Sequence, residues 1–260
     1  MRHLLLENMG FILPRRVEVA GGWQHALATN LLVEHVTVSL KTIDYLCPLY
    51  LYPGSKGDDL KKPGDKQVER KPNLEPSLVQ ALDRCFGRDV VPEEIFSYIY
   101  ALLYAPTYRT RYAEFLRADF PRVPFTRKAE LFTRVAHLGR RLVDLHLLKS
   151  PELDSPIARL QPTGANKVEK PRYSDNERRV YINETQHFEG VEPEVWAYQI
   201  GGYQVLDKWL KDRKGRTLNL DDITHYCRVV TALAKTIEIQ REIDTLYFGI
   251  EKDILTIQQA

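Results

Sequence analysis

Five cations stand close together around residue 210, at a spacing that suits contact with phosphate groups. The segment Val205–Leu210 places its apolar residues on one helical face, and Gly215 follows where a left-handed cap often ends a helix. Ammonium and guanidinium groups can donate to phosphate oxygens without reading a base. The candidate phosphate-binding residues are Lys208, Lys211, Arg213, Lys214 and Arg216.

A second group of polar side chains falls on two predicted turns of the N-terminal third. Side chains with donors and acceptors can read base edges from a loop, and a neighbouring lysine can hold a phosphate. For each residue alone, ordinary solvated surface is the competing interpretation. The candidates are Arg15, Arg16, Gln24 and His25 on one loop and Lys41 on the next turn.

Local signatures of catalysis are not found in the sequence. The stretch Gly54–Gly57 is the nearest match to a nucleotide-phosphate loop, but it lacks the spacing and the following helix. Metalloprotease, hydrolase and paired-cysteine motifs do not occur, and His137 and His146 lie far apart on one predicted helix. We therefore predict no catalytic residue, no metal ligand and no cofactor, although a split site of scattered acids and histidines would escape this scan.

The overall charge does not by itself indicate nucleic-acid binding. The 260 residues carry 37 basic and 35 acidic side chains, a net charge of +2, but residues 56–71 and 208–216 are locally basic. No apolar run approaches 18 residues, so we predict no membrane span. The apolar stretch at the N-terminus is too short for a secretory signal. Three scattered cysteines are typical of a reducing compartment, which predicts a cytoplasmic protein.

Hydrophobic patterning predicts the elements that must position these side chains. Strands are expected at 11–16, 33–40 and 45–52, with a loop over 17–30, an edge or bulge at Pro48 and a long exposed loop over 53–73. The predicted fold class is α+β. It comprises a small mixed sheet region in the N-terminal third and a hairpin near 167–183, embedded in helices that end in a C-terminal bundle.

Helices are expected at 76–86, 92–104, 107–118 and 127–148, with Arg109, Arg111 and Arg117 on the outside of the third. Residues 149–166 are predicted to form a connector. Asn219 or Asp221 should cap the last helix, which is one long helix or two pieces broken near Gly249. The expected parts are 1–52, β-rich; 53–74, an exposed loop; 75–190, helices and hairpin; and 191–260, helical.

Several long motifs resemble one family. They are Ile200–Arg216, IGGYQVLDKWLKDRKGR, and Glu93–Phe125, which begins EEIF and ends FPRVPF. Shorter matches lie at Asn8–Arg15, His35–Ser39 and Pro48–Pro53, in the family's order. Together they resemble the C-terminal target-recognition (specificity) domain of type ISP restriction–modification enzymes. Family members normally carry further strand sequence upstream, so the resemblance implies that this chain begins inside the domain.

The resemblance implies sequence-specific recognition of double-stranded DNA, without catalysis by this chain, on behalf of methyltransferase, helicase and nuclease parts carried elsewhere. The expected partners are duplex DNA and those parts, with a homodimer through the C-terminal helices as a further possibility. One alternative is a non-catalytic assembly fragment that docks on a separate methyltransferase through its C-terminal helices. Another is an independent enzyme, supported only by the chain's size and its Tyr and His residues.

Overall fold

Three short antiparallel strands form the sheet of the N-terminal third. The computed structural model describes residues 2–18, 22–53 and 69–256. The sheet order is β2-β1-β3, so β3 is an edge strand, as the proline near its end predicts. The central strand is buried along its whole length, and Phe11 stacks on Phe96 with ring centroids 3.9 Å apart. This region contains the short helix η1 (Arg2–Leu4), β1 (Gly10–Pro14), β2 (Leu27–Thr29), β3 (Asp44–Pro48), β4 (Tyr50–Leu51) and β5 (Lys71–Pro72).

The strand expected at 33–40 is wrong, and a strand forms instead at Leu27–Thr29, inside the expected loop. The alternation over 33–40 does not mark a strand because local groups bind its backbone. The Val38 amide donates to the Asp44 carboxylate at 2.7 Å, and a turn follows at Thr42. Most of the long loop expected over 53–73 lies outside the described residues, and β5, at its end, pairs with β4.

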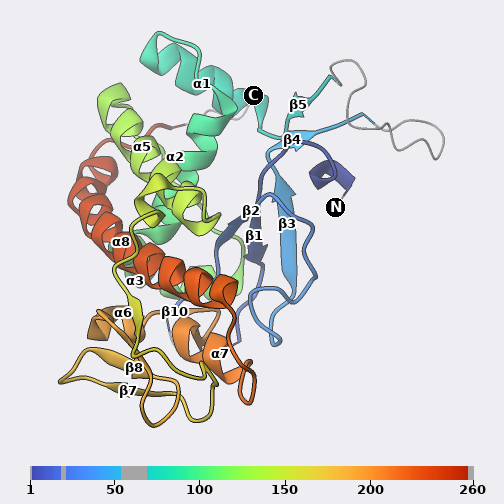
Figure 1. Ribbon diagram of the computed structural model, residues 1–260. Helices are drawn as coiled ribbons and strands as arrows, with labels where there is room; N and C mark the ends of the chain where they lie inside the picture. The colour runs from blue at the N-terminus through green and yellow to red at the C-terminus, as the bar shows by residue number, and fades with distance from the viewer. Residues whose placement is uncertain (1, 19–21, 54–68, 257–260) are drawn as a thin grey trace.

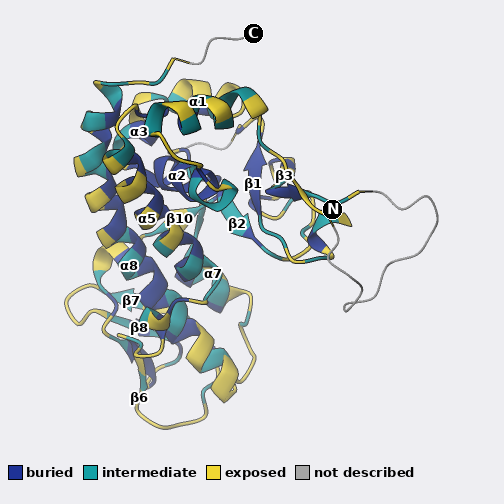
Figure 2. Ribbon diagram, turned by 90° about the horizontal axis from the view of Figure 1, so that it is seen from above, coloured by how far each residue is buried: buried dark blue, intermediate teal, exposed yellow. Residues whose placement is uncertain are grey.

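A layer of helices packs against this sheet. The helices at 76–86, 92–104 and 127–148 are confirmed, while the third breaks into two at Tyr112. Helices α2 and α5 approach so closely that a Cβ at Gly139 would lie 1.8 Å from the Ser97 carbonyl oxygen. In Figure 2 the body of α2 is buried, whereas α1 carries a long exposed face. The helices are α1 (Pro76–Phe86), α2 (Pro92–Tyr104), α3 (Pro106–Arg111), α4 (Ala113–Ala118) and α5 (Ala129–His146).

Arg109 is buried, contrary to the expectation that it lies outside its helix. Its guanidinium donates to the Leu103 carbonyl and lies 4.3 Å from the centre of the Tyr104 ring. The described residues provide it with no ion-pair partner within 4 Å, so carbonyl and aromatic contacts compensate for its burial. A buried arginine cannot be distinguished from an exposed one by helical spacing alone.

A second core forms around a four-stranded antiparallel sheet of order β6-β9-β8-β7. The hairpin near 167–183 is confirmed as β7 and β8, and a strand, β6, occupies part of the expected connector at 149–166. The elements here are η2 (Pro151–Leu153), β6 (Arg159–Gln161), β7 (Arg172–Ser174), β8 (Arg179–Tyr181), β9 (His187–Glu189), α6 (Pro193–Trp196), β10 (Gln199–Ile200), β11 (Tyr203–Gln204) and α7 (Val205–Lys211).

One unbroken helix, α8 (Leu220–Glu251), serves both cores (Figure 1). Asn219 caps it through a reciprocal pair of hydrogen bonds with Asp222, and Gly249 does not interrupt it. Its first half packs in the second core and its second half against α5 and α2.

The α+β class is confirmed. The division expected at residues 190 and 191 falls within the second core. Among the described residues, none of the helices has the length and apolarity needed to cross a membrane.

A chain of buried hydrogen bonds ties the sheet to these helices. The Tyr104 hydroxyl donates to the Ala26 carbonyl at 2.9 Å, and the Tyr100 hydroxyl lies 2.7 Å from Nδ1 of His146. Nε2 of the same ring lies 2.9 Å from the Thr236 hydroxyl on α8. Burial, reinforced by the charge of Arg109, lowers the pKa of His146 to about 3, so this ring is neutral at pH 7.

We expect the protein to lose stability as the pH falls from 7 to 5. The unfolded histidine takes up a proton near its ordinary pKa of 6.5, whereas folded His146 does not until about 3. His146 alone should remove about 2 kcal/mol of unfolding free energy over this interval. In urea denaturation, His146→Gln should show a correspondingly weaker pH dependence. His137→Gln, an exposed change on the same helix, should keep the original dependence. Equal pH dependence in both variants would contradict the assignment.

Candidate nucleic-acid interface

The N-terminal candidate residues gather at one end of the β2-β1-β3 sheet. Because the strands are antiparallel, with Pro14 opposite Asp44 and Ile12 opposite Leu27, β1 ends where β2 and β3 begin. The tip after β1, the segment before β2 and the turn before β3 therefore lie together, at the lower end of the sheet in Figure 1. Arg15, Arg16 and Lys41 are exposed there, and Gln24 is partly exposed.

A glycine turn places the β10–β11 hairpin against this end of the sheet. The Gly201 amide donates to the Gln24 carbonyl at 2.9 Å. A Cβ at Gly201 would lie 2.1 Å from the Val38 carbonyl oxygen, and its φ of +60° also favours glycine. Helix α7 follows β11 directly, and the Lys208 ammonium lies 5.7 Å from the centre of the Tyr203 ring. The structure thus joins the N-terminal loops to the start of α7.

Acidic neighbours offset several of the α7 cations. Lys208 pairs with Asp212, Lys211 pairs with Asp207 at 2.6 Å, and Arg213 lies 3.6 Å from Asp222. Arg213 also stacks 3.7 Å above the Trp209 ring centre. Exposed pairs of this kind contribute roughly 0–1 kcal/mol, so a lysine can exchange its carboxylate for a phosphate at little cost.

Lys214 and Arg216 lie beyond the other end of α7. Both are exposed, and neither has an ion-pair partner in the described part of the chain. Two hydrogen bonds fix their loop to the second sheet region. The Gly215 amide donates to the Val168 carbonyl at 2.7 Å, and the Val168 amide donates to the Arg216 carbonyl at 2.9 Å. The five cations of this segment therefore extend from the middle of α7, at Lys208, to the loop beyond its C-terminal end, at Arg216.

His25 does not lie on the surface that we expected. Its side chain is only 1% exposed, and its Nδ1 accepts the Gln24 amide at 3.1 Å. Burial, with smaller effects from Arg109 and Arg117, lowers its pKa to about 4, so the ring is neutral at pH 7. The ring supports the loop from the inside instead of facing solvent.

Two arginines that were not among the candidate residues, Arg117 and Arg122, lie near the tip after β1. The Val17 amide donates to the Arg117 carbonyl at 3.0 Å, which fixes the end of α4 next to the tip after β1. Arg15 pairs with Asp119 at 2.9 Å, and this hydrogen bond lowers the pKa of the carboxyl. Arg16 and Arg122 are exposed and have no ion-pair partner within 4 Å among the described residues. About 100 residues separate the two segments, so no local pattern predicts the cluster.

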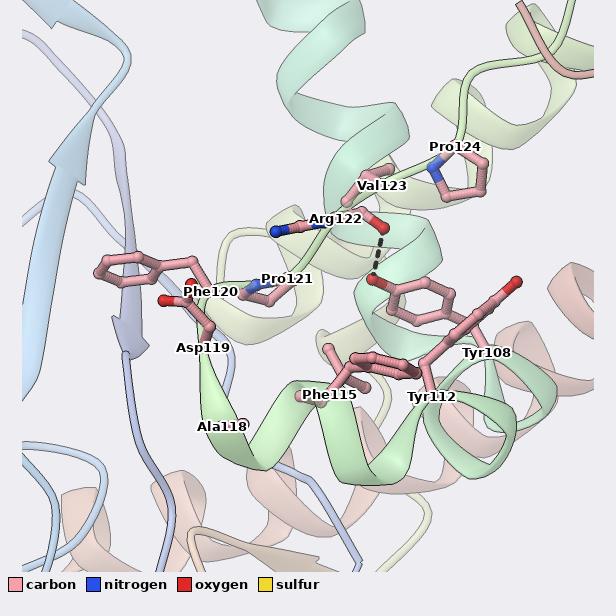
Figure 3. Close-up of a pocket in the computed structure, with 11 residues that line it drawn as sticks. Tyr108, Tyr112, Phe115, Ala118, Asp119, Phe120, Pro121, Arg122, Val123 and Pro124 are labelled. Atoms are coloured by element: carbon pink, nitrogen blue, oxygen red, sulfur yellow. Dashed lines mark hydrogen bonds between the residues drawn. The ribbon is translucent and has the colours of Figure 1, made fainter.

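A shallow hollow of about 480 Å³ lies next to this cluster, between α3–α4 and the segment 119–124. The Tyr108 hydroxyl donates across it to the Arg122 carbonyl at 2.9 Å (Figure 3). Figure 3 shows Phe120 directed away from Tyr108, and its ring meets Tyr45 edge-on at 5.2 Å. Asp119, the carboxylate that lines the hollow, is paired with Arg15, so the lining mainly offers aromatic and apolar contact.

No group of three or more His, Cys, Asp or Glu side chains is arranged to hold a metal ion within residues 2–18, 22–53 and 69–256. The geometry instead brings exposed cations and a partly exposed glutamine to one end of a sheet. Residues 1–242 match the family model of the Type ISP C-terminal specificity domain. The chain belongs to this family.

Solved structures share the fold of this specificity domain. A nuclease-deletion mutant of the Type ISP restriction–modification enzyme LlaGI, in complex with a DNA substrate mimic, matches with a TM-score of 0.59 and 17% identity over 91% of this chain and 18% of that chain. The DrdV–DNA complex matches with a TM-score of 0.62 and 24% identity, over 92% of this chain and 24% of that chain. The ATP-dependent Type ISP restriction–modification enzyme LlaBIII bound to DNA matches with a TM-score of 0.62 and 18% identity, over 97% of this chain and 16% of that chain. This chain therefore spans less than a quarter of each. A comparison with curated proteins gave no match.

Gly201→Ala should destabilise the specificity domain more than a matched glycine substitution does. At Gly201 alanine meets both a positive φ and overlap with the Val38 carbonyl, which together cost about 3 kcal/mol. Gly215→Ala meets a φ of +82° but open space, so about 1 kcal/mol is expected. Urea denaturation measures both. Equal losses would mean that the close approach at Val38 is not a constraint.

Proposed function

We propose that this specificity domain recognises duplex DNA sequence-specifically and uses the sheet end with the β10–β11 hairpin as its binding face. The observation that carries the proposal is the convergence of Arg16, Lys41 and Arg122 at that end, next to the hairpin that precedes Lys208. A duplex presents regularly spaced phosphates, which exposed cations on neighbouring loops can contact together. A chain of net charge +2 needs such local concentration to bind a polyanion.

Phosphate contacts would position the duplex, and the loop between β1 and β2 would read it. Gln24 is partly exposed in this loop, and its amide can both accept from and donate to an adenine edge in the major groove. Its backbone is bound on both sides, since its amide donates to His25 and its carbonyl accepts from Gly201. A fixed backbone keeps the side chain in register with the base that it contacts.

In this proposal the domain performs no chemistry, and methyltransferase and nuclease activities reside on other domains or chains. The LlaGI, DrdV and LlaBIII complexes contain DNA together with much longer polypeptides, which supports a recognition part within a larger enzyme. The alternative of docking through the C-terminal helix is less favoured. Ile239, Ile243 and Ile250 of α8 pack into the chain's own core, so its apolar stripe is already covered.

Selection from a random-sequence duplex library followed by fluorescence anisotropy would test the proposal. The full chain should enrich a shared sequence and bind it with an affinity that falls steeply between 50 and 200 mM salt. Enrichment of no sequence, together with no binding at low salt and micromolar protein, would overturn it.

Neutralising the clustered arginines should weaken binding in a way that a distant arginine does not reproduce. Arg16→Gln and Arg122→Gln should each reduce the slope of log affinity against log salt by about one. Arg134→Gln removes an exposed cation on α5 that likewise has no ion-pair partner among the described residues, so it serves as the control. An equal effect of all three changes would place the duplex elsewhere.

A further inference from the structure

The turn between Val38 and Asp44 carries two aliphatic side chains into solvent. Leu40 is 77% exposed, the largest fraction among the large apolar residues that the structure describes, and Ile43 is 64% exposed. An exposed leucine on its own needs no explanation. Here, however, the next residue after Leu40 is the exposed cation Lys41, and the turn lies at the end of the sheet where the arginines gather.

This turn is held stiffly from within. The Asp44 carboxylate accepts the Val38 amide at 2.7 Å, and the Asp44 amide donates to the His35 carbonyl at 2.7 Å. The Ser39 carbonyl accepts the Thr42 amide at 3.1 Å. Such internal bonds lower the entropy lost when the tip is bound, so a single apolar side chain can act as a rigid probe.

The base of the turn touches the hairpin that leads into α7. The Val38 carbonyl lies against Gly201, with no room for a Cβ between them. On the other side, Asp44 pairs with Pro14, and Arg15 and Arg16 follow. The turn that carries Leu40 and Lys41 therefore lies between the β10–β11 hairpin and the tip that carries Arg15 and Arg16, and a duplex in contact with both would cover it.

We propose that Leu40 inserts against the bases of the bound duplex and that Lys41 holds the adjacent phosphate. The inference rests on the proposed function and adds an element that reads or deforms the DNA. An apolar side chain between base steps partly unstacks them and makes recognition depend on how easily that step deforms. Exposed charges of both signs surround the turn, since Glu18 and Glu34 are exposed as well. The occupant is argued to be a duplex because three exposed cations there, Arg16, Lys41 and Arg122, have no ion-pair partner within 4 Å among the described residues.

The test uses the full chain and the duplex selected from the random library, with 2-aminopurine placed at one position at a time. Wild type should raise the 2-aminopurine fluorescence at one step, which reports local unstacking. Leu40→Ser should abolish that rise and weaken the affinity about tenfold without changing the salt slope. Lys41→Gln should lower the salt slope by about one and keep the fluorescence rise. Leu5→Ser, at 52% exposure beside η1, is the matched control and should behave as wild type.

The outcomes separate this inference from the proposed function. Absence of selected binding by wild type would overturn both. Selective binding with wild-type affinity for Leu40→Ser, or with no fluorescence rise at any position, would overturn the insertion alone and leave the recognition face intact. Thermal unfolding of Leu40→Ser should match wild type, because the side chain is exposed, so loss of binding cannot be attributed to misfolding.

Discussion

The close approach of Gly201 to the Val38 carbonyl is the contact on which the candidate interface depends. It fixes a hairpin of the second core against loops of the first, and only hydrogen fits at the Cα. The hydrogen bond from Gly201 to Gln24 adds direction to this contact. Since α8 also runs through both cores, the two halves are joined at the helix and at the loops. Their relative placement is therefore part of the fold, and a binding face built from both halves does not have to be assembled by a ligand.

The cations of this domain differ in whether an acidic side chain is paired with them, and not only in how many stand close together. The α7 lysines have carboxylate partners one helical turn away, whereas Arg16 and Arg122 have none within 4 Å among the described residues. A count along the sequence would rank α7 first, but the exposed cations without an ion-pair partner at the sheet end are visible only in the structure.

Local signals predicted the long helices, β1, β3 and the β7–β8 hairpin, but they missed β2 and placed a strand at 33–40 where a turn forms. Pro92 followed by acidic residues marks the start of α2, and Asn219 with Asp222 marks that of α8, so both helices follow from adjacent residues. Strand β2 depends on partners elsewhere in the chain, such as the Tyr100 and Tyr104 hydroxyls that bind β2 and the residues before it. The turn at 38–44 depends on the Asp44 side chain, whose bond to the Val38 amide the alternating pattern does not reveal. The motifs that resemble the family identified it, but they could not show that Arg122 lies near Arg16 or that His25 is buried. Those facts depend on contacts about 100 residues apart.

The buried polar residues beneath the loops complete the physical argument. Arg109 is a cation in the interior. Burial, together with the charge of Arg109, strongly lowers the pKa values of His25 and His146. Keeping both rings neutral avoids repulsion with the guanidinium and leaves one nitrogen of each ring able to accept a hydrogen bond. The Tyr104 hydroxyl, which donates to the Ala26 carbonyl, ties the loop before β2 to the helices, and the Gly201 amide ties it to the β10–β11 hairpin. A loop restrained in both directions loses little entropy when it binds, so its few exposed side chains can contribute most of their contact energy to discrimination between partners.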